Sequence, residues 1–294
     1  VGSRVPVEDL IRGIIIQSGN DACVVVAEAL GGTVDGFVDM MNKRAKQLGL
    51  KQSHFVNPDG LPDPPGQLMS ALDLATLARH LINDYPQYYH YFGERSFVWN
   101  GITQQNRDMV LDKLDGADGL KTGHTDASGY GITASAKQKG QRLILVLNGL
   151  RYPDLDKSSP QRQDWFAERR RSDEAARILG LAFREFRKYP VAKADTVVGN
   201  APVWQGTADT VPLVVGKPLN VTLQVESRHG MKVAVRYDGP IKAPIAKGQR
   251  VGTLEVTAPE FPGLKVPVYA ANAVDRAGIF GRMFLGIRHM ITGH

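Results

Sequence analysis

Residues 119–148 read GLKTGHTDASGYGITASAKQKGQRLILVLN, and this stretch decides the fold. Residues 131–136 and 142–148 are short and largely apolar, and the polar residues 137–141 separate them. This pattern predicts two strands joined by a turn. The triplet Lys121-Thr122-Gly123 comes just before them and is expected on or beside a strand edge.

Helical patterns precede this stretch. Residues 7–16, 22–30 and 33–48 predict three helices, and Asp21 is the expected N-cap of the second. The tripeptide Ser18-Gly19-Asn20 therefore lies at the junction of the first two helices.

Local signals continue the α and β pattern of the first domain. Ser70 is predicted to start another helix, and Asn100-Gly101 is a strong hairpin signal between two short strand patterns. Residues 172–186 predict a last helix. We therefore expect a mixed α/β domain over residues 1–188.

The chain changes character near Tyr189-Pro190. Residues 219–225 and 231–237 alternate apolar and polar side chains, which predicts neighbouring antiparallel strands, and residues 250–257 and 265–270 predict two more. We expect a small all-β domain at 189–275 and a separate terminal segment at 276–294.

The composition is that of a folded globular chain. It has 294 residues, of which 43% are hydrophobic and 22% are charged. The net charge of +6 favours an anionic partner, such as a membrane surface, nucleic acid or cell-wall polymer. The single Cys23 excludes an internal disulfide framework and a cysteine-cluster metal site.

Two polar motifs carry the candidate chemistry. Ser18-Gly19-Asn20 alone is ordinary turn chemistry, and Lys121-Thr122-Gly123 alone is a common triplet. Active-site serine acyl-transferases of the penicillin-recognising kind combine a Ser-x-Asn between helices with a Lys-Thr-Gly on a strand edge. The joint order and spacing therefore predict an acyl-transfer site.

The sequence resembles the type-5 low-molecular-mass penicillin-binding proteins, which are D-alanyl-D-alanine carboxypeptidases of the bacterial cell wall. Besides the two triplets, the loop Phe55–Leu61 (FVNPDGL), the turn Trp99–Ile102 (WNGI) and the segment Gly119–Thr125 (GLKTGHT) match this family in order. The resemblance implies a penicillin-recognising, β-lactamase-like α/β domain, a small all-β domain and a C-terminal amphipathic helix.

The resemblance also implies roles for individual residues. Ser18 relays a proton to the leaving D-alanine, Lys121 tunes the local potential, and Asn20 holds the substrate amide. Thr122, with its neighbour Gly123, binds the substrate beside a cation that takes the terminal carboxylate. The backbone N–H of His124 completes the oxyanion hole.

The carboxylate cation is expected at the start of the last helix of the first domain, in an Arg-x-x-Glu setting. Arg171 with Glu174 fits this setting, but Arg169 and Arg170 stand beside it and remain alternatives. A solvated basic helix start is the ordinary interpretation of such a run.

The family's nucleophile lies in a Ser-x-x-Lys motif, and no serine in this sequence is followed three positions later by lysine. Because the sequence opens at Val1 inside an expected domain, we predict that it is the C-terminal part of an enzyme. A catalytically dead relative that binds peptidoglycan is the alternative. A D,D-endopeptidase or a weak β-lactamase shares the same motifs.

No cofactor, metal or nucleic acid is expected. The glycine pattern at residues 129–134 resembles a dinucleotide fingerprint but leads into a strand, and the seven histidines lack metal-ligand spacing. The positive charge is scattered, and no nucleic-acid-binding module is present. The expected partners are the peptidoglycan pentapeptide and β-lactams.

The C-terminal segment has a membrane-binding pattern. Phe280, Phe284, Ile287 and Ile291 recur at helical spacing with basic residues beside them, which predicts an amphipathic helix on an anionic membrane surface. A helix docked on the β domain is the alternative. The resemblance implies a periplasmic, peripheral location on the outer face of the inner membrane.

Overall fold

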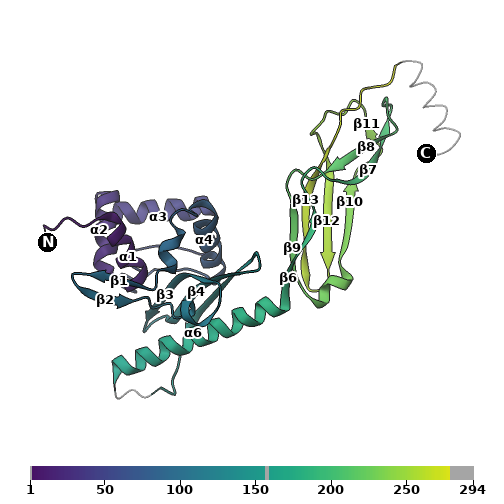
Figure 1. Ribbon diagram of the computed structural model, residues 1–294. Helices are drawn as coiled ribbons and strands as arrows, with labels where there is room; N and C mark the ends of the chain where they lie inside the picture. Colours follow the sequence, from purple (N-terminus) through teal and green to yellow (C-terminus); the bar gives the residue numbers. More distant parts are fainter. Residues whose placement is uncertain (1, 156–158, 279–294) are drawn as a thin grey trace. The chain divides into compact units, whose positions relative to one another are not determined.

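The computed structural model describes residues 2–155 and 159–278 (Figure 1). The chain divides into two compact units, Val1–Phe183 and Arg184–His294. This division falls between Phe183 and Arg184 rather than between residues 188 and 189. Strand β6 (Phe186–Ala192) runs across the expected boundary and pairs with β9 (Leu219–Gln224) of the second unit.

The first unit combines helices with a three-stranded antiparallel sheet of order β3-β4-β5. Its elements are α1 (Val7–Gln17), α2 (Asn20–Gly31), α3 (Val34–Leu48), α4 (Ala71–Asp84), η1 (Tyr89–Gly93), β1 (Ser96–Trp99), β2 (Ile102–Gln105), α5 (Val110–Lys113), β3 (Ala117–Thr125), β4 (Gly129–Gln138), β5 (Gln141–Leu150) and α6 (Pro160–Glu185).

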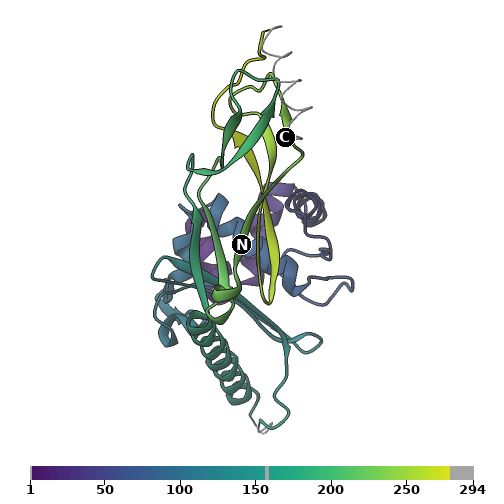
Figure 2. The same ribbon diagram turned by 90° about the vertical axis from the view of Figure 1, so that its right-hand side faces the viewer.

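The sheet of the first unit lies between two helical layers. Because side chains alternate along a strand, Ile132 and Ala134 of β4 point to one face, where they pack on Leu179 of α6. On the other face, Leu120 and Ile144 belong to the cluster of α4 and η1. Figures 1 and 2 show α6 along one side of the sheet and α1 to α4 on the other.

Several local signals are confirmed. The side chain of Ser70 caps α4, since it accepts the backbone N–H of Asp73. Thr33, which the sequence pattern placed within its helix, is found to cap α3 in the same way. Asn100 and Gly101 join β1 to β2 with φ values of 50° and 76°, which is the pair of positive φ angles that a tight hairpin turn requires.

The Lys-Thr-Gly triplet lies in β3, the edge strand of the sheet, as its expected place on a strand edge requires. Two local expectations are wrong in detail. The N-cap of α2 is Gly19 rather than Asp21, whose carboxylate accepts the N–H of Ala22 inside the first turn. Helix α6 begins at Pro160 instead of residue 172. The sequence pattern did not indicate its first turns because they are mostly polar.

Over residues 186–278, the second unit is all β apart from one short 3-10 helix. Its remaining elements are β7 (Val197–Trp204), β8 (Thr210–Val214), η2 (Glu226–Gly230), β10 (Lys232–Tyr237), β11 (Ile241–Lys242), β12 (Arg250–Ala258) and β13 (Phe261–Ala270). Six strands form one sheet of order β10-β12-β13-β8-β7-β11, and β6 and β9 form another. Leu213, Leu254, Val256 and Val268 are among the fully buried residues of its core.

The pairing in this unit differs from the sequence expectation. Strands β9 and β10 are not partners: β9 pairs with β6, and β10 pairs with β12, because η2 separates them. Strands β6, β7 and β8 were not predicted, because each contains a proline that interrupts its alternating pattern. These prolines are Pro190, Pro202 and Pro212.

The expected terminal helix over residues 280–291 falls outside the described residues. Within the described ranges, no helix combines the length and apolar character needed to cross a membrane.

Candidate active site

A cavity of about 860 Å³ in the first unit is lined by all seven residues that the sequence analysis assigned to catalysis or substrate binding. They reach it from the α1–α2 junction, from strand β3 and from helix α6. The seven residues are Ser18, Asn20, Lys121, Thr122, Gly123, His124 and Arg171.

The α1–α2 junction brings Ser18 and Asn20 to the cavity. Ser18 ends α1 in the left-handed conformation, with φ 58° and ψ 43°, and the N–H of Gly19 bonds back to the carbonyl of Gly13 at 3.1 Å. Asn20 is then the first residue of α2. Lys121 Nζ donates to Ser18 Oγ at 3.0 Å, so the two motifs are in direct contact.

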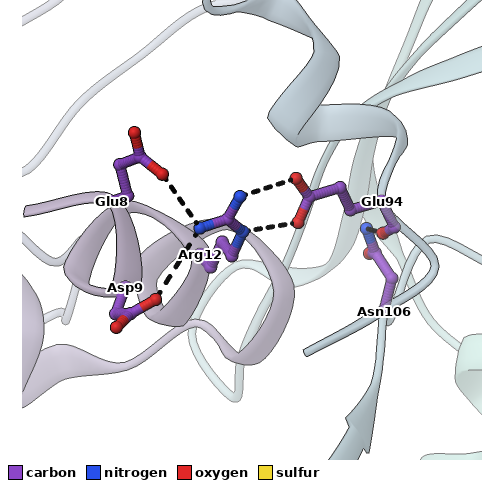
Figure 3. Close-up of polar contacts among 5 residues, drawn as sticks. All are labelled: Glu8, Asp9, Arg12, Glu94 and Asn106. Atoms are coloured by element: carbon purple, nitrogen blue, oxygen red, sulfur yellow. Dashed lines mark hydrogen bonds and ion pairs between the residues drawn. The ribbon is translucent and has the colours of Figure 1, made fainter. Parts of the chain in front are cut away.

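Helix α1 is fixed to the rest of the unit by an ion pair (Figure 3). Arg12 Nε donates to Glu94 Oε2 at 2.8 Å, and Glu8 and Asp9 approach the same guanidinium from their own helix. The side-chain amide of Asn106 donates to the backbone carbonyl of Glu94 at 2.9 Å. These contacts tie the helix that ends at Ser18 to the loop that follows β2.

The Asn-Pro-Asp-Gly loop lines another part of the cavity. Asn57 is buried, and its amide nitrogen donates to the carbonyls of Leu61 at 2.8 Å and Asp63 at 3.3 Å. Its side-chain oxygen accepts the N–H of Gly60 at 2.8 Å. Asn57 thereby organises the loop that presents Asp59, Gly60 and Leu61 to the cavity.

Lys121 shares the cavity with two other basic side chains, Arg107 and Arg171. Burial lowers the pKa of Lys121 to about 8, and the charges of Arg107 and Arg171 act in the same direction. The Lys121 ammonium is held by the carbonyl of Thr122 at 2.8 Å besides Ser18. The cavity lining also holds the carboxylates Asp59, Asp164 and Glu168, so the three cations are gathered in one part of a lining of mixed charge.

Of the three neighbouring arginines Arg169, Arg170 and Arg171, only Arg171 lines the cavity. It is 1% exposed, and its guanidinium donates to the carbonyls of Arg107 at 3.2 Å and Gly123 at 3.5 Å. Arg170 instead pairs with Asp154 at 2.6 Å, and Arg169 lies over the exposed ring of Trp165. The structure thus separates the three neighbours that the sequence left open.

A sequence signal for this choice exists and was missed. Ala167, Ala175 and Leu179 of α6 are fully buried and are spaced by multiples of four residues. Arg171 falls in the same stripe, so only this arginine of the run points toward the sheet.

Beside the triplet, His124 and Tyr130 form one wall. Their rings are stacked, with centroids 3.7 Å apart, and the Tyr130 hydroxyl donates to Asp164 Oδ1 at 2.6 Å. Thr122 is buried and also lines the cavity. Of these side chains, Tyr130 and Asp164 were not expected from the sequence, and neither were the lining residues Arg107, Asp59, Glu168 and Asn148.

This arrangement holds several of the groups that acyl transfer uses, without the nucleophile. A hydroxyl in contact with an ammonium group can pass protons, a side-chain amide can hold a peptide group, and buried cations can bind a carboxylate. Among residues 2–155 and 159–278, there is no group of three or more His, Cys, Asp or Glu residues that fits a metal ion.

Comparison with protein families gives two matches. Residues 1–151 match the model described as D-alanyl-D-alanine carboxypeptidase. Residues 186–276 match the model described as penicillin-binding protein 5, C-terminal domain. The two matches correspond to the two structural units.

Individual relatives agree with these matches. The chain is 37% identical to the D-alanyl-D-alanine carboxypeptidase DacD of Escherichia coli, over 96% of this chain and 69% of that protein. It is 35% identical to DacA of the same organism, over 98% of this chain and 68% of the relative. The crystal structure of penicillin-binding protein 5 from Haemophilus influenzae superposes with a TM-score of 0.79 at 33% identity, covering 93% of this chain and 76% of that one. The chain therefore belongs to the D-alanyl-D-alanine carboxypeptidase family, among its type-5 low-molecular-mass penicillin-binding proteins.

Proposed function

We propose that the protein removes the terminal D-alanine from peptidoglycan pentapeptide stems through an acyl-serine intermediate. The observation that carries this proposal is the 3.0 Å contact between Lys121 Nζ and Ser18 Oγ, in a cavity that also holds Asn20, Thr122 and Arg171. Family membership supports the same reaction.

Recognition of the substrate rests on charge. Arg171 is buried, and no carboxylate of the described chain lies within ion-pair distance of its guanidinium, so its charge is available to the free carboxylate of a peptide. The Thr122 hydroxyl is the second donor, and Gly123 contributes the backbone beside it. The Asn20 amide, which can both donate and accept, holds the peptide group before the scissile bond.

The chemical step requires a serine nucleophile. We propose that a Ser-x-x-Lys pair outside these 294 residues supplies it, because no such motif occurs within them. The serine oxygen bonds to the carbonyl carbon of the penultimate D-alanine, and the backbone N–H of His124 helps to hold the oxyanion. The C–N bond then breaks, and Ser18 passes the serine proton to the leaving amine. Water later hydrolyses the ester.

Intact-mass spectrometry of the full-length protein with penicillin tests this proposal. A β-lactam acylates the same serine, so we expect one covalent adduct on the full-length protein and none on the 294-residue chain. A full-length protein that forms no adduct would contradict the acyl-enzyme mechanism and favour the peptidoglycan-binding alternative. Rapid loss of the adduct with release of opened penicillin would identify a weak β-lactamase.

We also propose that the protein is periplasmic and binds the outer face of the inner membrane through residues 276–294. The support is the sequence spacing of Phe280, Phe284, Ile287 and Ile291, whose burial in lipid contributes about 1.5 to 3 kcal/mol each. Co-sedimentation with anionic liposomes should be salt-sensitive and should fall when the chain is ended at Arg276. Equal sedimentation of both forms would show that the segment does not bind lipid.

A further inference from the structure

The end of strand β3 carries the proposed oxyanion donor, and backbone pairing supports it from one side only. β3 is the edge strand of its sheet, and His124 and Tyr130 form the next-to-last residue pair before the turn to β4. Behind this pair, the register between β4 and β5 shifts between Tyr130 and Ile132. Because a shifted register interrupts the ladder of backbone hydrogen bonds, other contacts must hold this end of the sheet.

Side chains provide such contacts. The His124 ring lies on the Tyr130 ring, with centroids 3.7 Å apart and an angle of 8° between the ring planes. The Tyr130 hydroxyl donates to Asp164 Oδ1 of α6 at 2.6 Å, which is the short distance typical of a hydroxyl bonded to a carboxylate. Tyr130 is 8% exposed, and burial together with Asp164 raises the pKa of its hydroxyl, which therefore stays a neutral donor. The His124 ring is thus joined to α6 through Tyr130.

Helix α6 contacts the same end of β3 a second time. Arg171 lies about two helical turns after Asp164, so both side chains project from one face of the helix. The Arg171 guanidinium donates to the carbonyl of Gly123 at 3.5 Å, and this carbonyl belongs to the peptide unit that also contains the N–H of His124. His124, Tyr130, Asp164 and Arg171 all line the cavity. One helix face therefore holds the Gly123–His124 peptide unit at two points.

We propose that Asp164 and Tyr130 are positioning residues of this active site, which hold the N–H of His124 where the oxyanion forms. The inference rests on the proposed function, because that N–H has its role there. An oxyanion donor stabilises the transition state only when it is aimed at the oxygen of the tetrahedral intermediate. A small displacement of the donor therefore weakens binding of the transition state more than binding of the substrate.

The test is the kinetics of D-alanine release from a pentapeptide by the full-length protein and by its variant Tyr130→Phe, which removes the hydroxyl and keeps the ring. We expect kcat to fall about 10-fold, because the donor is no longer held in place. KM should stay almost unchanged, since Thr122 and Arg171 still bind the terminal carboxylate.

Tyr89→Phe is the matched control. Tyr89 is 9% exposed, and its hydroxyl donates to Asp118 Oδ1 at 3.0 Å, but it is not among the described residues that line the cavity. The two substitutions delete the same kind of hydrogen bond within the same unit, so they should lower the melting temperature by similar amounts. Only Tyr130→Phe should lower kcat.

Variants of Asp164 break the bond from the other side and separate position from charge. Asp164→Asn loses the charge but keeps a side-chain oxygen that accepts from Tyr130, so its kcat should stay within about twofold of the wild type. Asp164→Ala loses the acceptor and should match Tyr130→Phe. The double variant Tyr130→Phe/Asp164→Ala should be no slower than either single variant, because all three lack the same bond.

The outcomes separate the two claims. An unchanged kcat in both Tyr130→Phe and Asp164→Ala would overturn the positioning role and leave the proposed function intact. An equal fall of kcat in Tyr89→Phe would assign the loss to general stability, and an equal fall in Asp164→Asn would assign it to charge, so either result would also overturn the role. A wild-type full-length protein that releases no D-alanine would overturn the proposed function itself. If one single variant does not fold, the other removes the same bond and decides the test.

Discussion

Replacing Lys121 with alanine should lower the rate of acylation of the full-length protein by penicillin about 100-fold or more. The change removes a partly buried cation that contacts Ser18 at 3.0 Å and stabilises negative charge as it develops in the cavity. Stopped-flow or quenched measurement of adduct formation gives the rate. In the wild type, the same cation should make the rate fall as the pH rises above about 8, where Lys121 loses its proton.

This substitution should not lower the stability of the fold. Burial holds the pKa of Lys121 below its ordinary value of 10.5, so the folded state binds the proton less strongly than the unfolded chain does. At neutral pH the charge therefore costs stability, and Lys121→Ala should melt at the same temperature or higher, with an unchanged circular dichroism spectrum. Near-normal acylation by a folded Lys121→Ala protein would mean that the triplet is only part of a strand.

Replacing Arg171 with alanine should reduce kcat/KM for release of D-alanine about 30-fold or more, because the substrate carboxylate loses its buried partner. The loss should appear mainly in KM, since the carboxylate is bound in the ground state as well as in the transition state. Kinetics of D-alanine release from a pentapeptide measure both constants.

Arg170→Ala is the matched control for this substitution. It removes an equal charge from the adjacent position, but Arg170 is exposed and pairs with Asp154 instead of lining the cavity. A loss of activity that is the same in both variants would show that the general positive charge of α6 matters, and that Arg171 has no specific contact with the substrate.

Features set by neighbouring residues could be predicted from the sequence. The N-cap Ser70, the Asn100-Gly101 hairpin and the helices α1 to α4 depend on contacts within a few residues, which a single sequence displays. The two motif triplets could be joined only through their resemblance to a family, because nothing local indicates that Ser18 and Lys121 touch across 103 positions.

Features set by packing could not be predicted in this way. Tyr130 and Asp164 belong to no motif, and their hydrogen bond exists only because β4 and α6 pack together. The strand order of the second unit could not be predicted either. The alternation along β9 and β10 shows that each is a strand but does not specify its partner. The first turns of α6 were not predicted as helix because they are mostly polar.

The central claim is that this cavity binds a free terminal carboxylate and directs cleavage to the last peptide bond. Its most direct test is the ratio of kcat/KM of the full-length protein for a pentapeptide ending in D-Ala-D-Ala and for the same peptide with an amidated C-terminus. The account predicts that the free acid is cleaved at least about 30-fold more efficiently, because only its charge engages Arg171 and Thr122. Equal cleavage of acid and amide would contradict it.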